Sequence, residues 1–218
     1  MWKNFLSLIY PSTCLVCDGL LHVNENMLCL SCVSELPKTP LNHIISNEVG
    51  VQQYNASIAL FEFNTINCKK LIHQLKYEGN YQLGEFFGVE LGKAILSNLS
   101  TKNFDYLIPV PINRRKRRAR GYNQSYILAK QVSKIIKVPV LNVLSRKRKQ
   151  KTQTNKNRYQ RWENVEGEFN VKSKHNLDYK HLLIIDDVLT SGATVDACIK
   201  ELKKKYIVKV SIAVLAIA

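Results

Sequence analysis

The sequence contains no acidic residue between Tyr106 and Trp162, although 17 of its 32 lysines and arginines lie there. The rest of the chain is nearly balanced, with 15 basic and 17 acidic side chains, so one quarter of the chain produces the net charge of +15. A block of one sign repels itself unless water or anions neutralise it. The asymmetry favours a phosphate-bearing partner, a nucleotide or a nucleic acid, over a solvated basic surface.

Long apolar runs are also missing. The longest, residues 210–218 and FLSLIY at 5–10, fall short of the roughly 20 residues of a membrane-spanning helix. The N-terminus has no small-residue cleavage site, and cysteine pairs follow it, which argues against a secretory signal. We expect a cytoplasmic protein, with the inner face of the membrane as an alternative because residues 2–10 are amphipathic.

The 218 residues, 45% of them hydrophobic, suffice for one α/β core and a small appendage. Apolar patterns predict strands over 54–63, 105–110, 139–144, 181–187 and 207–218. Four helices are predicted: one that ends near Gly79, two that cover 83–96 and 122–137, and one that ends near Lys205. Alternating strands and helices indicate a parallel sheet flanked by helices, built from residues 46–218, with residues 1–45 as a separate small module.

Four cysteines in that module have the spacing C-x2-C-x11-C-x2-C: Cys14, Cys17, Cys29 and Cys32. Two such pairs predict a tetrahedral thiolate site for a structural Zn2+, which supplies folding energy that a module of this size lacks. Two disulfides are the alternative, disfavoured in a cytoplasmic chain. His22 lies between the pairs and is expected to be solvated. Cys68 and Cys198 are expected to be buried without partners.

The segment HLLIIDDVLTSGATV, residues 181–195, ends a buried strand with two carboxylates. Asp186 and Asp187 are expected to bind ribose hydroxyls or the Mg2+ shell, because open α/β sheets bind ligands at the carboxyl ends of their strands. The next residues offer hydroxyls, a glycine and free N–H groups at a helix start, which predicts a phosphate-binding turn. Simple helix capping by Ser or Thr is the alternative.

This segment resembles the phosphoribosyl-diphosphate (PRPP) motif of type I phosphoribosyltransferases. Together with PVPINRRKRRARGYNQS at 109–125, KYEG at 76–79 and the four cysteines, the chain is similar to the ComF family over nearly its whole length. The resemblance implies a type I phosphoribosyltransferase-like parallel sheet with a zinc-ribbon-like N-terminal module. It also implies a role in the uptake of single-stranded DNA during natural transformation, with the DNA-uptake machinery as partner.

The resemblance assigns the PRPP site residue by residue. It implies that Asp186 and Asp187 bind the ribose hydroxyls. The 5-phosphate is expected to be bound by Thr190, Ser191, Gly192, Ala193 and Thr194. The diphosphate, together with Mg2+, is expected to be bound by a loop after strand 105–110 and by the cations Lys76, Arg114, Arg115 and Arg120. A mobile loop at 146–161 is expected to close over the site and to bring Lys149 or Arg158 to the departing pyrophosphate, so Asp186, Asp187, Lys149 and Arg158 are the expected catalytic residues.

Three hypotheses for the function follow. The first is a ComF-like protein that binds PRPP and single-stranded DNA, and the second is a nucleic-acid-binding module with a relic pocket. The third is a nucleotide-salvage enzyme, although Thr190 replaces the aspartate of 6-oxopurine enzymes. The expected nucleic-acid contacts combine cations with aromatic platforms: Arg117, Arg118, Tyr122, Arg148, Tyr159, Arg161 and Trp162.

Overall fold

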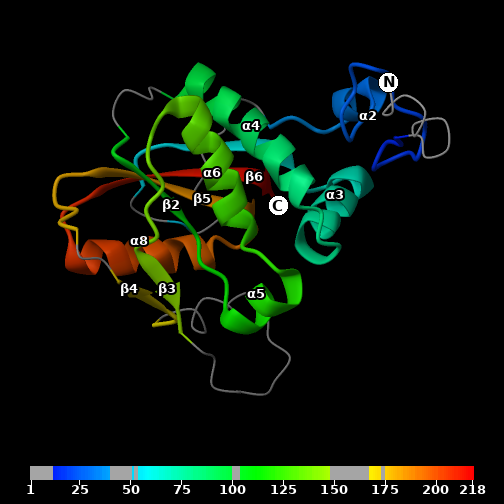
Figure 1. Ribbon diagram of the computed structural model, residues 1–218. Helices are drawn as coiled ribbons and strands as arrows, with labels where there is room; N and C mark the ends of the chain where they lie inside the picture. The colour runs from blue at the N-terminus through cyan, green and yellow to red at the C-terminus, as the bar shows by residue number, and fades with distance from the viewer. Residues whose placement is uncertain (1–11, 40–50, 52–53, 100–103, 148–166, 173–174) are drawn as a thin grey trace.

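The computed structural model describes residues 12–39, 51, 54–99, 104–147, 167–172 and 175–218 (Figure 1). Its central sheet has the strand order β1-β6-β5-β2. All neighbouring strands run parallel, as the alternation of strands and helices predicts. The strands are β1 (Ser57–Glu62), β2 (Tyr106–Pro109), β5 (His181–Leu189) and β6 (Lys209–Ile217).

The strand β5 is buried on both faces because it lies inside the sheet. Its side chains alternate between two cores: Leu183 and Ile185 pack on one face, and Leu182 and Ile184 on the other. Such a strand is a near-continuous apolar run, which is why its position could be predicted from HLLII.

Helices cover both faces of the sheet (Figure 1). One face carries α3 (Ile66–Tyr77), α4 (Tyr81–Asn98) and α6 (Gln124–Ile136), and the other carries α8 (Ala193–Lys205). The predicted α/β class is confirmed. Within the described ranges, none of the helices is long and apolar enough to span a bilayer.

The basic segment after β2 is a helix, α5 (Arg114–Arg120), where the sequence predicted a loop. Asn113 caps it by accepting a hydrogen bond from the backbone N–H of Lys116 at 2.7 Å, and Gly121 ends it in a left-handed conformation with φ 81°. The helix buries none of its residues, so it has no apolar periodicity from which it could be predicted.

The strand predicted over 139–144 is also wrong in its extent. Only Val140 forms a bridge there, to Leu107, and the regular strand β3 (Leu144–Arg146) begins later. β3 pairs antiparallel with β4 (Phe169–Val171), which the sequence did not predict. Pairs of three-residue strands carry too few residues to show an alternating pattern.

The cysteine module, residues 12–39, contains the short helix α2 (Leu30–Ser34) and lies beside α3 (Figure 1). Lys70 of α3 donates a hydrogen bond to the carbonyl oxygen of Val16 at 2.8 Å. Residues 37–39 then run along β1, where Glu62 N–H donates to Pro37 O at 2.8 Å and Thr39 N–H donates to Leu60 O at 3.0 Å. The boundary predicted at residue 45 lies outside the described residues and stays a prediction.

Candidate functional site

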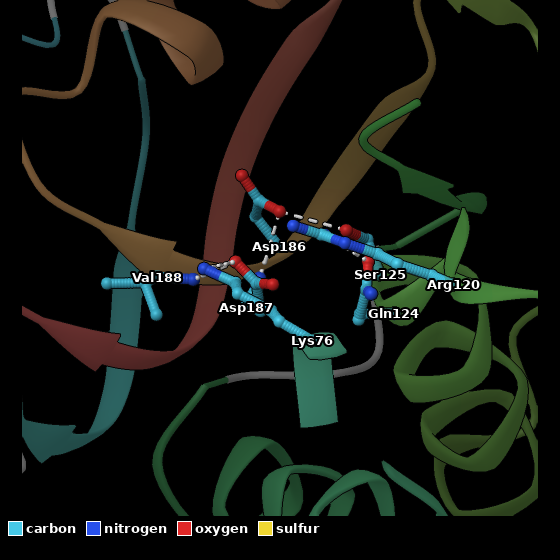
Figure 2. Close-up of polar contacts among 7 residues, drawn as sticks. All are labelled: Lys76, Arg120, Gln124, Ser125, Asp186, Asp187 and Val188. Atoms are coloured by element: carbon cyan, nitrogen blue, oxygen red, sulfur yellow. Dashed lines mark hydrogen bonds and ion pairs between the residues drawn. The ribbon is translucent and has the colours of Figure 1, made fainter. Parts of the chain in front are cut away.

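Two buried carboxylates stand near the carboxyl end of β5. Asp186 is 9% exposed and Asp187 is 8% exposed. Oδ1 of Asp186 accepts hydrogen bonds from Ser125 Oγ at 2.8 Å and from the backbone N–H of Asp187 at 2.9 Å. Oδ1 of Asp187 accepts from the backbone N–H of Val188 at 2.7 Å (Figure 2). These bonds fix the orientation of both carboxylates.

The surroundings of Asp186 disfavour its ionised form. Burial and the adjacent charge of Asp187 together raise the pKa of Asp186 to about 7, against the hydrogen bond from Ser125. A carboxyl group with such a pKa exchanges its proton near neutral pH. A cation or a hydroxyl-bearing ligand that approaches the pair therefore favours its fully ionised form.

Lys76 reaches the pair from the last turn of α3. Its Nζ lies 3.1 Å from Oδ1 of Asp187, and its side chain is only 22% exposed. Figure 2 shows Lys76 pointing toward Asp187 from a helix that is far away in the sequence. The structure thus brings one predicted cation together with the predicted acid pair.

The site has an acidic half, formed by Asp186 and Asp187, and a basic half, formed by α5 and the start of α6. Arg120 donates a hydrogen bond from Nη1 to Oε1 of Gln124 at 3.1 Å, and its guanidinium lies 4.7 Å from the centroid of the Tyr77 ring. Because Tyr77 follows Lys76, the end of α3 contacts both halves of the site. Arg114 and Arg115 are exposed, and their assignment to the diphosphate stays a prediction.

The turn from Thr190 to Thr194 joins β5 to α8. Gly192 has φ 75° and precedes the first residue of α8, and no side chain caps this helix. Thr190 is exposed, whereas Gly192 and Ala193 are buried. The arrangement matches the predicted strand, turn and helix start, which is the type of turn that presents N–H groups to an anion.

Two further cations were not predicted from the sequence. Partial desolvation of the exposed Lys116 side chain lowers its pKa, as do the nearby charges of Arg146 and Arg120, so these side chains share one region. Arg146 donates to Oε2 of Glu168 from Nε at 2.9 Å and from Nη2 at 2.6 Å. Hydrophobic periodicity carries no information on such contacts, because they join α5, β3 and β4 across the fold.

The remaining predicted catalytic and nucleic-acid-binding residues are partly within and partly outside the described residues. Arg117 and Arg118 are exposed on α5, whereas Tyr122 is partly buried and donates its hydroxyl hydrogen to Leu75 O at 2.7 Å. The others lie outside the described residues: Arg148, Lys149, Arg158, Tyr159, Arg161 and Trp162.

The four cysteines of the module converge, as their spacing predicts. The Sγ atoms of Cys14, Cys17, Cys29 and Cys32 all lie within 4.8 Å of one another. Backbone N–H groups point at the sulfurs, with Cys29 N donating to Cys14 Sγ at 3.4 Å and Cys32 N to Cys29 Sγ at 3.5 Å. Burial raises the pKa of Cys14, but N–H donors lower it to about 6, which favours the metal-binding thiolate. Four convergent thiols fit a tetrahedral zinc site.

Comparison with known proteins agrees with this geometry. A family model described as "Phosphoribosyl transferase domain" matches residues 123–217, which include the first turn of α6, both aspartates and the turn after β5. The purine phosphoribosyltransferase from Pyrococcus horikoshii shares 20% identity with this chain, with a TM-score of 0.39, and the match covers 61% of this chain and 74% of that one. The match to the family model thus covers the part of the chain that contains the acid pair and the turn after it.

Two curated relatives match most of the chain. Competence protein F of Haemophilus influenzae is 26% identical over 216 residues, covering 88% of this chain and 90% of that protein. Competence protein ComFC of Bacillus subtilis is 23% identical over 218 residues, covering 85% of this chain and 86% of that protein. The resemblance to the ComF family is thereby confirmed.

Proposed function

We propose that this protein binds PRPP, or a related phosphoribosyl ligand, together with Mg2+ at the carboxyl end of β5. The observation that carries the proposal is the buried pair Asp186 and Asp187 near the end of β5, separated by two residues from the turn that leads into α8, a helix that no side chain caps. Carboxylates accept hydrogen bonds from ribose hydroxyls, and the turn offers N–H groups to the 5-phosphate.

The carboxylates of this pair also fit a magnesium ion, because hard carboxylate oxygens are its preferred protein ligands. Bound Mg2+ would neutralise charge that develops on a departing pyrophosphate. The chain's own part is to position the ligand. Ser125 and the Asp187 N–H hold the Asp186 carboxylate. Lys76 supplies positive charge beside Asp187, and Arg120 supplies it beside Gln124 at the start of α6.

Calorimetric titration of PRPP with Mg2+ tests the proposal. We expect wild-type protein to bind and Asp187→Asn to bind at least tenfold more weakly, since the substitution removes a charge that the ligand and metal require. Asp105→Asn is the matched control, because Asp105 pairs with Lys180 at the opposite end of the sheet and should not affect binding. Equal affinities of wild type and Asp187→Asn would refute the site.

A second function, the binding of single-stranded DNA, is favoured by the exposed arginines of α5. The helix carries six basic residues and no acid, and Arg117 and Arg118 point into solvent. Replacing both by alanine should lower the slope of log affinity against log salt concentration by about 1.4, since each contacted phosphate contributes about 0.7. PRPP affinity should not change.

The relatives are named as competence proteins, so we further propose a role in DNA uptake during transformation, together with the uptake machinery at the inner membrane face. A chromosomal Asp187→Asn substitution should then lower transformation frequency without affecting growth. Pyrophosphate release with a free nucleobase as acceptor would instead favour the nucleotide-salvage hypothesis. Normal transformation by the Asp187→Asn strain would make the pocket a relic with respect to DNA uptake.

A further inference from the structure

Helix α3 contacts both the cysteine module and the candidate site. Near its middle, Lys70 donates a hydrogen bond from Nζ to Val16 O of the module at 2.8 Å. Near its end, Nζ of Lys76 lies 3.1 Å from Oδ1 of Asp187 (Figure 2). Lys76 follows Lys70 by six positions, which is about 9 Å along a helix axis at about 1.5 Å per residue. One short helix therefore connects the two regions.

The contacts with the module are made to the turn that carries its first two cysteines. Leu15 and Val16 are the two residues between these cysteines. Gln74 of α3, which is buried, donates from Nε2 to Leu15 O at 3.5 Å, a longer contact than the Lys70 bond to Val16 O. Both carbonyl groups within the turn thus accept from α3.

The N–H groups of the same turn act on the cysteine cluster. Burial raises the pKa of the Cys14 thiol, whereas backbone N–H groups, including those of Cys17 and Val16, lower it. The peptide group between Val16 and Cys17 therefore directs its N–H toward a cysteine sulfur and its carbonyl oxygen toward Lys70. Hydrogen bonds around metal ligands fix the orientation of those ligands. A single peptide group thus connects the cluster to α3.

Apolar packing also joins the module to α3. The buried side chains of Cys68, Leu71 and Leu75 in α3 belong to the same apolar cluster as Leu28 and Leu36 of the module. Close-packed interiors have low compressibility and transmit small displacements. A shift of the module is therefore expected to move α3 as a body.

We propose that Lys70 and Gln74 are positioning residues that couple the four-cysteine site to the phosphoribosyl site. They hold α3 against the turn at 14–17, and α3 in turn holds Lys76 beside Asp187. The inference rests on the proposed function, because Lys76 is taken to act on the phosphoribosyl ligand. Such coupling is reciprocal, so the ligand also strengthens the binding of zinc to the module.

Lys70→Met tests the coupling, because it removes the ammonium donor and leaves the four thiols intact. In calorimetric titration, PRPP with Mg2+ should bind about three- to tenfold more weakly, while elemental analysis should still find about one zinc per chain. Loosening the pair of Lys76 and Asp187 should let Mn2+, a substitute for Mg2+, bind about two- to threefold more tightly without PRPP. In a Lys76→Met background, Lys70→Met should change neither affinity.

Three further substitutions complete the design. Lys70→Arg keeps a donor for Val16 O and should bind both ligands like wild type. Lys69→Met is the matched control, because Lys69 is exposed on the same helix and should affect neither ligand. Gln74→Met removes the second contact and should repeat the effects of Lys70→Met more weakly, which provides a test even if Lys70→Met does not fold.

Zinc affinity gives an independent measurement of the coupling. In competition with a chelating dye, wild-type protein should hold zinc about three- to tenfold more tightly when PRPP and Mg2+ are present. Lys70→Met should lose most of this difference. Equal zinc affinities of the wild-type protein with and without bound PRPP would overturn the coupling.

The two ligands also distinguish this proposal from the phosphoribosyl function. If wild-type protein binds PRPP and Lys70→Met binds PRPP and Mn2+ like wild type, the coupling fails and the phosphoribosyl function stands. If wild-type protein does not bind PRPP but Lys70→Met binds Mn2+ more tightly only when Lys76 is present, the phosphoribosyl function fails and the positioning of Lys76 stands. Weaker binding of both ligands by Lys70→Met would show general damage to the site and overturn the positioning role.

Discussion

Lys76 places its ammonium nitrogen 3.1 Å from Oδ1 of Asp187, and the two side chains are only 22% and 11% exposed. A cation of the protein itself thus occupies a position that a metal ion would need. Lys76 and Mg2+ should compete for the same carboxylate, whereas Lys76 and the diphosphate attract each other.

We therefore predict opposite effects of Lys76→Met on two ligands. Removing the ammonium group should strengthen the binding of Mn2+, used as a spectroscopic substitute for Mg2+, by about fivefold, or about 1 kcal/mol, when no PRPP is present. The same substitution should weaken PRPP binding. Electron paramagnetic resonance titration measures the first effect, with exposed Lys69→Met of the same helix as the control. Unchanged Mn2+ affinity would contradict the competition.

A second prediction concerns the pH dependence of stability. The fold raises the pKa of Asp186 to about 7. Between about pH 4 and pH 7, the folded protein therefore holds a proton that the unfolded chain has already released. The contribution of Asp186 to stability should fall as the pH rises through this window. Asp186→Asn keeps an uncharged oxygen that can accept from Ser125 and from the Asp187 N–H. As the pH rises, the free energy of unfolding of this variant should therefore increase relative to wild type by up to about 1 kcal/mol per pH unit, and the difference should level off above pH 7.

Urea unfolding of wild type and variant at pH 4.5, 6.0 and 7.5 would measure this difference. Asp105→Asn should show the opposite trend, because the backbone N–H of His181 and the ammonium of Lys180 lower the pKa of Asp105 despite its partial burial. Its carboxylate stabilises the fold above the unfolded pKa and loses that effect as the pH falls. A difference for Asp186→Asn that does not vary with pH would show that this carboxyl titrates normally.

A third prediction concerns the cysteine cluster. Protein purified under reducing conditions without chelator should contain about one zinc per chain, and Cys17→Ser should lose it, since structural sites use four ligands. Cys68→Ala should retain the metal, because Cys68 lies in α3 outside the cluster. Elemental analysis of the purified variants checks both outcomes, and zinc retained by Cys17→Ser at full stoichiometry would rule out the four-thiolate site.

A fourth prediction tests the close packing of α4 on α6. A Cβ atom at Gly88 would lie 2.7 Å from Cβ of Gln131 and 3.1 Å from the carbonyl oxygen of Leu128. Gly88→Ala should therefore destabilise the protein by about 1–3 kcal/mol, although alanine is the better helix former. Exposed Ser97→Ala on the same helix should have little effect in chemical denaturation. Stabilisation by Gly88→Ala would show that the helices can separate at low cost.

Elements with a strong apolar pattern could be predicted from the sequence. The apolar run HLLII predicted the position of β5. It also predicted the position of Asp186 and Asp187, because the two aspartates follow the run directly in the sequence. The two Cys-x2-Cys turns likewise specify their own geometry, and the four sulfurs converge. The predicted turn from Thr190 to Thr194 lies where the chain leaves β5 for α8.

Contacts between distant segments could not be predicted from such patterns. The Ser125 bond to Asp186 joins residues 61 positions apart, and Gln124 and Arg146 have no local feature that marks them as part of a site. Helix α5 was missed because its boundaries depend on Asn113 and Gly121 while its surface remains in solvent. Short-range periodicity reports burial, and these residues owe their positions to tertiary packing.

Both edges of the central sheet are covered by irregular chain. Residues 37–39 pair with β1 at one edge, and at the other Leu107 N–H donates to Pro139 O and Leu141 N–H donates to Leu107 O, each at 2.9 Å. An uncovered edge strand is a template for sheet extension between molecules. Residues 37–39, at the end of the cysteine module, therefore also protect the protein against aggregation, and versions that lack them should self-associate through β1.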